Sequence, residues 1–187
     1  MDKFALIKKE IKKIMLESPI KFDPMHSKIT LDWVLRLKPN ADEALQIAAL
    51  AHDIDRPITG ITETFGLKNL SNLEEFKREH AKRSAKIIAE IMKKYAYSEA
   101  VIIKAAHLVE KHEEGGDEES NILMDADSIA YFDYNLPWYF EKNGKNKTQD
   151  KIKFMYNRLS VKGKNIVDSM KFSSKDVADL FKEATKK

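Results

Sequence analysis

The sequence predicts an all-α protein. Apolar residues recur three or four positions apart along most of the 187 residues, and no segment shows the alternating apolar and polar pattern of a β-strand. Proline and glycine interrupt this spacing at intervals that suit helices joined by loops. Because 43% of the residues are hydrophobic, the chain can bury a proper core, and we expect a single domain over residues 1–187.

The first two expected helices are bounded by prolines. Apolar residues at helix spacing from Phe4 onward predict a helix that ends before Pro19. A second helix is expected between Pro24 and Pro39, with His26 on its apolar stripe. Each helix is therefore expected to bury one face.

The third expected helix is rich in alanine. Asn40 followed by Glu43 resembles a capping box, and the apolar face that follows ends at His52. The helix is expected to stop near Pro57. Residues 57–70 contain glycine and scattered threonine, which is typical of a long loop.

The second half of the chain continues the helical pattern. Ser71 and Glu74 are expected to cap a fourth helix, on which His80 shares a stripe with aliphatic residues. Further helices are expected at 98–113, through Asp127 and Tyr131, and around 149–160, 162–170 and 174–185. An acidic Gly-Gly loop separates the first two of these.

The composition restricts the possible metal ligands, the cellular location and the binding partners of the protein. The chain has no cysteine, which excludes disulfides and thiolate ligands, so any metal must be held by histidine and carboxylate. Charged residues interrupt the apolar residues at the N-terminus too often for a signal peptide. No apolar run approaches the roughly 18 residues of a membrane span. We expect a cytoplasmic protein without a membrane partner. The net charge of +3, from 33 basic and 30 acidic residues, favours solubility over nucleic-acid binding.

Four of the five histidines occur in one order with aspartates. The series is His26, His52-Asp53, His80, His112 and Asp127. Imidazole nitrogen and carboxylate oxygen together form the ligand set of a hydrolytic transition metal. His52 and Asp53 point about 100° apart on a helix, so both reach one ion only where the helix end opens into a cleft. The alternative, a core His52 with Asp53 bonded to backbone amides, stays open for the pair alone.

The other histidines strengthen the metal hypothesis. His26, His80 and His112 lie on inward-facing stripes, and burying a polar nitrogen without a partner costs on the order of 1–3 kcal/mol. A shared metal would satisfy all three. His107 lies off the apolar stripe of its helix, so we expect it on the surface or behind the ligands.

The series resembles the HD superfamily of metal-dependent phosphohydrolases, whose pattern is His, His-Asp and a distant Asp. The resemblance rests on the segments Met25-His26-Ser27, Ala48-Ala49-Leu50-Ala51-His52-Asp53-Ile54, Glu79-His80-Ala81-Lys82-Arg83-Ser84-Ala85, Leu108-Val109-Glu110-Lys111-His112-Glu113 and Asp125-Ala126-Asp127-Ser128-Ile129. It implies an HD-type helical bundle, of the kind found in phosphodiesterases, over about 23–135. A helical extension over 136–187 would follow.

The resemblance also implies an activity, that of a metal-dependent phosphohydrolase acting on a nucleotide or another small phosphorylated molecule. The first metal would be surrounded by His26, His52, Asp53 and Asp127. His80 and His112 fall where two-metal members add ligands, as in those that cut dinucleotide polyphosphates. The cofactor would be one or two divalent transition-metal ions, from among Fe, Mn, Co, Ni and Zn. Asp125 competes with Asp127 for the last position, and we favour Asp127 because Ala126 fits the family's pattern.

Hydrolysis would use a metal-activated water, which Asp53 can orient while it binds the metal. Phosphate needs further positive charge, and the candidates are Arg56, after the His-Asp pair, and Arg78 and Arg83 on the following helix. For each arginine an ordinary solvated charge is the alternative. The loop 57–70 is placed to cover the cleft, with Arg56 at its hinge.

Residues 142–164 form a basic stretch that includes two aromatic residues. Its cations include Lys145, Lys147, Lys151, Lys153 and Arg158. Interleaved with Phe154 and Tyr156, they could close a phosphate pocket or touch nucleic acid. Ile152 and Leu159 fit a core-facing stripe, so we favour a solvated basic face.

Three other functions stay open. The same ligand set can hold a di-iron centre, as in HD-type oxygenases. The chain could instead be a catalytically inactive nucleotide-binding regulatory module, or a basic helical nucleic-acid-binding protein. The sequence does not name the substrate, and it allows a homodimer without fixing the oligomeric state.

Overall fold

The computed structural model describes residues 2–63, 72–172 and 174–186, and over these residues its regular structure is entirely helical. The prediction of an all-α protein is therefore confirmed. The helices are α1 (Lys3–Met15), α2 (Asp23–Leu37), α3 (Glu43–Ala51), α4 (Asp55–Thr59), α6 (Leu73–Lys94), α7 (Glu99–Lys111), α8 (Glu118–Ala130), the π-helix η1 (Tyr131–Asn135), α9 (Leu136–Asn157), α10 (Val161–Asp168) and α11 (Lys175–Thr185).

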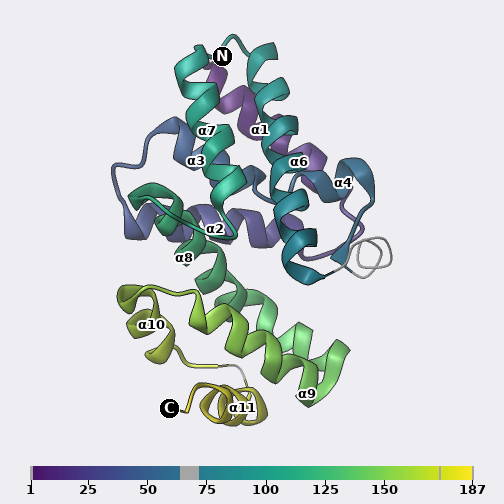
Figure 1. Ribbon diagram of the computed structural model, residues 1–187, viewed down its shortest axis with the longest axis vertical. Coiled ribbons are helices and arrows are strands. Elements are labelled where there is room, and N and C mark those ends of the chain that lie inside the picture. Colours follow the sequence, from purple (N-terminus) through teal and green to yellow (C-terminus); the bar gives the residue numbers. More distant parts are fainter. Residues whose placement is uncertain (1, 64–71, 173, 187) are drawn as a thin grey trace.

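The molecule is elongated, with two groups of helices joined by α8 and its π-helical continuation (Figure 1). In the larger group α6 packs along α7, α2 packs along α8, and α3 contacts both α2 and α7. In the smaller group α9 packs on α11, while α10 contacts α8. The two chain ends lie at opposite ends of the molecule (Figure 1).

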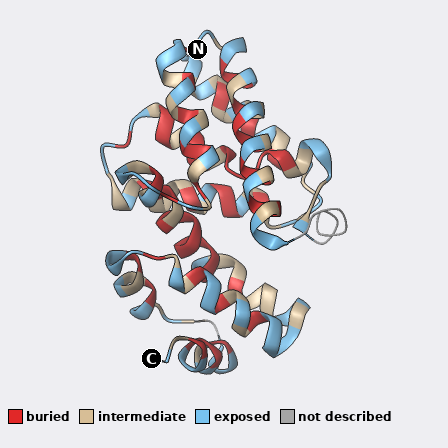
Figure 2. Ribbon diagram, in the orientation of Figure 1, coloured by how far each residue is buried: buried red, intermediate tan, exposed pale blue. Residues whose placement is uncertain are grey.

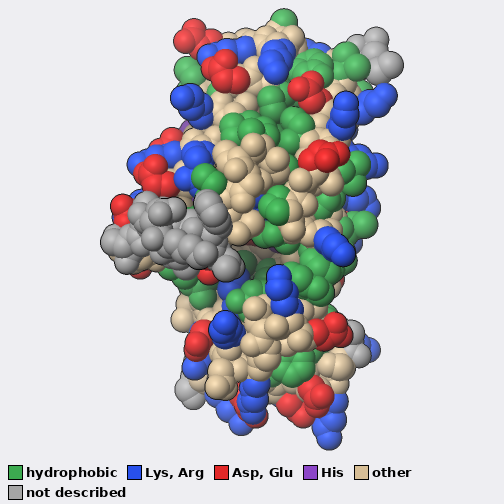
Figure 3. All heavy atoms as spheres, turned by 90° about the vertical axis from the view of Figure 1, so that its right-hand side faces the viewer, with side chains coloured by type: hydrophobic (Ala, Val, Ile, Leu, Met, Phe, Trp, Pro, Cys, Tyr) green, Lys and Arg blue, Asp and Glu red, His purple; other side chains and the backbone are tan. Residues whose placement is uncertain are grey.

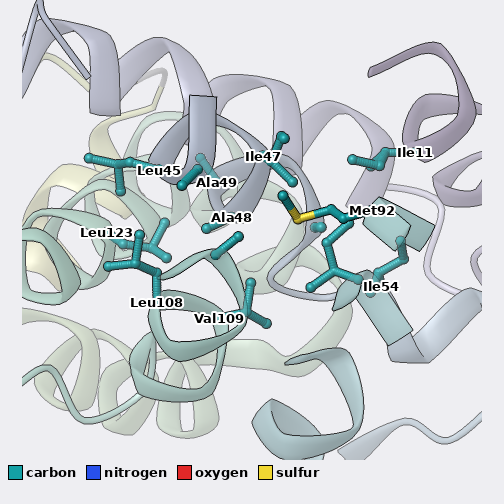
Figure 4. Packing of buried hydrophobic residues seen from close by; sticks show 14 of the residues in the cluster. Ile11, Leu45, Ile47, Ala48, Ala49, Ile54, Met92, Leu108, Val109 and Leu123 are labelled. Carbon is teal, nitrogen blue, oxygen red and sulfur yellow. The ribbon is translucent and has the colours of Figure 1, made fainter. Parts of the chain in front are cut away.

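Helix α3 forms the centre of the larger core. Leu45 and Ala48 face Leu108 of α7 and Leu123 of α8, and Ile47 faces the side of α1 and α6 (Figure 4). Most residues of α3 are buried (Figure 2). The small alanine side chains of α3 let the neighbouring helices pack closely around it. The end of α3 therefore lies deep in the protein. That end carries the His-Asp pair.

A second core lies among η1, α9, α10 and α11. Ile129, at the end of α8, belongs to this core, whereas Ala126, one turn earlier, belongs to the first. Trp33 and Leu37 of α2 pack against both. Helix α8 therefore contributes to both cores, and a residue on it can be held from both sides.

Two expected caps differ from those in the structure. The cap of α3 is Asp42, whose side chain accepts a hydrogen bond from the backbone N–H of Leu45 at 3.0 Å, so the prediction of Asn40 is wrong. Asp42 caps the helix instead of Asn40 because it directly precedes the first helical turn and has an extended backbone. Ser71 lies outside the described residues, and the cap of α6 is Asn72, which accepts from the N–H of Glu75.

The expected long loop after the His-Asp pair begins with a short helix. α4 contains Pro57 in its first turn, where the missing proline N–H would have no helical partner in any case. α4 ends at Thr59, and its C-cap Gly60 has a φ of 70°, the left-handed conformation that glycine adopts without strain. Residues 64–70 of the expected loop lie outside the described residues.

Helix α9 starts thirteen residues before the expected position near Gln149, at Leu136. Pro137 falls in its first turn, and Gly144 has non-helical backbone angles that kink the helix. A sequence pattern that treats proline and glycine as breaks therefore misses its first half. The two helices that follow lie close to their expected positions.

Basic and acidic side chains are mixed over the surface seen in Figure 3, in keeping with the small net charge. None of the described helices combines the length and apolar character needed to cross a membrane.

Candidate metal centre

The structure brings the six candidate metal ligands together in the interior. His26 comes from α2, His52 and Asp53 from the end of α3, His80 from α6, His112 from the end of α7, and Asp127 from α8. Each is at most 8% exposed. The imidazole rings follow one another, with centroids of His52 and His112 5.3 Å apart and those of His80 and His112 5.4 Å apart.

The ligands form two adjoining groups, each with candidate donor atoms within 4.8 Å of one another. The groups are His26, His52 and Asp127, and Asp53, His80 and His112. Asp53 lies where they meet, because its Oδ1 is 2.9 Å from His80 Nε2 and its Oδ2 is 3.6 Å from His52 Nε2. One carboxylate thus spans both groups, and each group could hold an ion.

Backbone carbonyls fix two of the imidazoles. His52 Nδ1 donates to the carbonyl of Ala49 at 2.9 Å, and His112 Nδ1 donates to that of Val109 at 2.7 Å. Both carbonyls belong to the last turn of the helix that each histidine ends. Because a carbonyl only accepts, Nδ1 carries the proton and Nε2 is the nitrogen left for a metal.

Side-chain oxygens fix the other two imidazoles in the same sense. His26 Nδ1 donates to Asn135 Oδ1 at 2.9 Å, and His80 Nδ1 donates to Asp55 Oδ1 at 2.6 Å. The π-helix η1 carries Asn135, and π-helical turns often mark functional positions. All four histidines therefore direct Nε2 toward the candidate centre.

The donor set fits a cation. Among the described residues His52 Nε2 is buried without a hydrogen-bond partner, and its neighbours are carboxylate oxygens of Asp53 at 3.6 Å and Asp127 at 3.7 Å. These distances are too long for hydrogen bonds. Three acceptor atoms that face one another in the interior suit a positive ion between them.

The charges of these groups also suit a metal. Burial raises the pKa of Asp127, but the hydrogen bond from His26 and the charge of Arg158 outweigh it and hold the pKa well below its usual range. Burial lowers the pKa of His112 to about 4, so this imidazole is neutral at neutral pH. An ionised carboxylate and a neutral imidazole are the forms that bind metal.

His80 holds a proton where a cation would lie. Burial lowers its pKa, but hydrogen bonds to Asp53 and Asp55 outweigh burial and raise the pKa to about 9. His80 Nε2 donates a hydrogen bond to Asp53 Oδ1, and His26 Nε2 donates one to Asp127 Oδ1 at 2.9 Å. A divalent ion would take the place of these protons.

Asp125 and His107 lie apart from the two groups. Asp125 accepts from the backbone N–H of Ser160 at 2.8 Å and from its hydroxyl, at the start of α10. His107 is on the surface, with its side chain 51% exposed and bonded to Asp117. The structure therefore groups Asp127, and neither Asp125 nor His107, with the other candidate ligands.

The three candidate phosphate-binding arginines lie in different surroundings. Arg56 contacts Asp53 directly and donates to Asp23 Oδ1 at 3.2 Å, so it borders the centre. Arg83 forms an ion pair with Asp55, the partner of His80, and its Nε and Nη2 lie 3.0 Å and 2.9 Å from Asp55 Oδ2. Arg78 is exposed. Of the three, Arg56 alone touches a candidate ligand within the described residues.

A family comparison applies to nearly the whole chain. Residues 9–180 match the model of a family described as Domain of unknown function (DUF4202). The chain belongs to the DUF4202 family. The match includes all six candidate ligands and most residues of both hydrophobic cores. No curated protein and no solved structure matches the chain.

One residue of this DUF4202 protein corrects the expectation for the basic stretch 142–164. Most of its lysines are exposed, but the side chain of Arg158 is only 8% exposed. It donates to the carbonyl of His112 at 2.6 Å and to Glu113 Oε2 at 2.8 Å, and it lies 3.3 Å from Asp127 Oδ2. The prediction of a solvated face is therefore wrong for Arg158.

Sequence reasoning missed the residues that support the ligands in this DUF4202 chain. They are Asp23, Asp55, Lys77, Glu113, Asn135 and Arg158. Asp55 and Glu113 stand beside recognised ligands in the sequence, and that adjacency was the available signal. Asn135 and Arg158 lie among residues whose role depends on how the second group of helices packs, so spacing along the chain gave no sign of them.

Proposed function

We propose that the protein is a metal-dependent phosphohydrolase that acts on a nucleotide or another small phosphorylated molecule. One or two divalent transition-metal ions, from among Fe, Mn, Co, Ni and Zn, would be held by His26, His52, Asp53, His80, His112 and Asp127. The observation that carries the proposal is the shared orientation of four buried imidazoles, each with Nδ1 bonded outward and Nε2 directed to the same place. The resemblance of the sequence to the HD superfamily supports it.

The position of each candidate ligand suggests which ion it would hold. His26, His52 and Asp127 would hold one ion, His80 and His112 would hold the other, and Asp53 would span the two. A bound divalent ion polarises a phosphoryl oxygen and lowers the pKa of a water molecule until hydroxide forms near neutral pH. The Asp53 carboxylate, held in place by His80 and Arg56, would orient that water.

Arg56 supplies the nearest positive charge for a phosphate. Its guanidinium lies between Asp53 and the buried Asp23, and its side chain is 22% exposed, so one side remains accessible. A guanidinium can contact a carboxylate and a phosphate oxygen together because it offers several N–H donors in one plane. Asp23 would keep it aimed at the centre.

A di-iron oxygenase is the second candidate, because the position of Asp53 suits it equally well. A single carboxylate between two groups of histidine ligands, as Asp53 is here, suits a pair of iron ions as well as a hydrolytic pair. Iron content together with oxygen consumption in the presence of a reductant would favour the oxygenase. Phosphate release that does not need oxygen would favour the hydrolase.

Asp53→Ala tests the proposal directly. The purified protein should contain a transition metal, and with Mn, Co, Ni, Fe or Zn added it should release phosphate from at least one member of a panel of nucleotides and sugar phosphates. Asp53→Ala should lose metal and phosphate release together, with helical content by circular dichroism unchanged. Asp32→Ala, which removes a half-exposed carboxylate from α2, is the control and should keep both. Unchanged metal occupancy in Asp53→Ala would refute the assignment.

A further inference from the structure

Three cations gather around one partly exposed aromatic ring beside the candidate metal centre. Lys77 Nζ lies 3.4 Å from the ring centroid of Phe154, Lys151 Nζ lies 5.5 Å from it, and Arg158 Cζ lies 5.7 Å from it. Lys77 belongs to α6, Lys151 and Phe154 belong to α9, and Arg158 directly follows α9 as its C-cap. We call these four residues the Phe154 cluster. Phe154 itself is 37% exposed, so the cluster reaches the surface.

The Phe154 cluster adjoins the group formed by Asp53, His80 and His112. Lys77 precedes His80 by one turn of α6 and donates to Glu113 Oε2 at 3.1 Å. The other carboxylate oxygen of Glu113 is 3.8 Å from His112 Nε2. Arg158 donates to the carbonyl of His112. A ligand that touches the candidate metal centre could therefore also touch the cluster.

The cluster carries more positive charge than its surroundings neutralise. Glu113 pairs with both Lys77 and Arg158, whereas Lys151 has no carboxylate within ion-pair distance among the described residues. If Asp127 is taken by a metal, three cations face one carboxylate, which leaves a surplus of two positive charges. Arg158 Nε is also buried, and no described residue forms a hydrogen bond with it.

The three cations lie close together, so each repels the positive charge of the others. Burial lowers the pKa of Lys77 to about 8 although the Glu113 carboxylate acts to raise it, and the neighbouring charges of Lys151 and Arg158 act in the same direction as burial. The attraction of Lys77 to the face of Phe154 compensates in part. An anion bound among the three cations would remove the remaining repulsion.

We propose that the Phe154 cluster binds a second phosphate group of the substrate, so that the substrate is a diphosphate or longer phosphoanhydride rather than a monophosphate. This inference rests on the proposed function, because it places the reacting phosphate at the metal centre and the second phosphate on Lys77, Lys151 and Arg158. The surplus of two positive charges matches a phosphate dianion. Arg158 offers its charge and an Nε that has no hydrogen-bond partner among the described residues, and the lysines offer point charges.

Binding of ADP and AMP to the manganese-loaded protein tests the inference. Both molecules share the adenosine and the first phosphate, so the ratio of their dissociation constants, measured by calorimetry in excess Mn²⁺, reports the second phosphate. ADP should bind about tenfold more tightly than AMP, as one charge-assisted contact implies. Lys151→Met should remove most of that ratio. Lys153→Met removes the same charge from an exposed position on the same helix and should leave the ratio within about twofold.

The outcomes separate this inference from the proposed hydrolysis. If no phosphate is released from any substrate but the ratio depends on Lys151, the second phosphate site stands and the hydrolytic function fails. If ADP and AMP bind equally, or the ratio survives Lys151→Met, the site is refuted even where phosphate release is observed. If Lys153→Met lowers the ratio as much as Lys151→Met, the effect is one of general charge on α9, and the site is refuted as well.

Discussion

His112 is the residue that best reports whether the protein holds two ions. Its imidazole is neutral, buried and fixed by the carbonyl of Val109, and it belongs to the group that excludes His26 and Asp127. Removing it should leave the other group intact. We expect about two ions per chain in the wild type and about one in His112→Ala.

Metal analysis of the purified variants by mass spectrometry measures this count. His107→Ala is the control, because His107 is an exposed histidine on the same helix, and it should leave the count unchanged. A single ion in the wild type, with no loss in His112→Ala, would mean a mononuclear site.

Asp55 determines the orientation of His80. The carboxylate is fully buried, accepts from His80 Nδ1 and is held from behind by Arg83. Outer partners of this kind typically contribute about 10- to 100-fold to metal affinity. Asp55→Asn keeps the shape but removes the charge, so we expect metal at the His80 group to bind about 10- to 100-fold more weakly.

Competition with a fluorescent chelator would measure this affinity. Glu90→Gln, which removes a carboxylate from an exposed ion pair on α6, should not change it. Equal affinities in Asp55→Asn and the wild type would show that packing alone fixes the His80 ring.

At the scale of residues, donor chemistry made the candidate ligands predictable. A metal accepts only a few side-chain types, so His26 and His52-Asp53 stand out in a chain with five histidines, whereas Asp127 was favoured because of the resemblance to the HD superfamily. Their partners could not be found in this way. Ala49 and Val109 contribute backbone carbonyls, which every residue has, and the sequence carries no mark of which carbonyl an imidazole will use.

The start of α8 carries a capping box. Asp117 accepts hydrogen bonds from the backbone N–H groups of Glu119 and Ser120, and the Ser120 hydroxyl accepts one from the N–H of Asp117. Loss of such a cap typically costs about 1 kcal/mol. We expect Asp117→Ala to lower the free energy of unfolding by about that amount at pH 7, measured by urea denaturation.

The contribution of Asp117 should depend on pH in one direction. The hydrogen bond from the Ser120 N–H lowers the pKa of the Asp117 carboxyl from its ordinary value of 3.8 to about 2. The stabilisation is therefore fully present above pH 4 and declines as the pH falls toward 2. Asp117→Asn keeps the cap without the titration, so it should reduce this pH dependence. The same loss of stability in Asp117→Asn and the wild type between pH 4 and 2 would contradict the assignment.

At the scale of elements, helices of uniform pattern were predictable and irregular ones were not. The spacing that starts at Phe4 predicts α1 closely because nothing in that segment breaks a helix. α9 departs from its expected position because Gly144 kinks the helix instead of ending it. The π-helix η1 has no sequence pattern of its own, yet it places Asn135 against His26. Such irregular elements depend on the packing around them.

At the scale of the whole molecule, the candidate centre lies where separate helices meet. α2, α3, α6, α7 and α8 or their ends each supply at least one candidate ligand, and Arg158, the C-cap of α9, contacts Asp127 from the side of the second core. Sequence analysis predicted the helices but not how these two cores meet on α8, because that depends on contacts between residues far apart in the chain. A bound ion would consequently join most of the fold.

Metal should therefore raise the stability of the entire protein rather than that of one helix. The unfolded chain cannot assemble ligands from five helices, so an ion at a concentration of 100 times its Kd should add about 2.7 kcal/mol. For a chain of this size that corresponds to a rise in Tm of roughly 5–10 °C. Differential scanning calorimetry with and without a chelator would measure the rise, and both cores should unfold in one transition when the ion is bound. Asp53→Ala should show no rise on adding metal, because the carboxylate that spans the two groups is gone. An unchanged Tm in the wild type with and without metal would mean that the buried histidines and aspartates stabilise one another through protons alone.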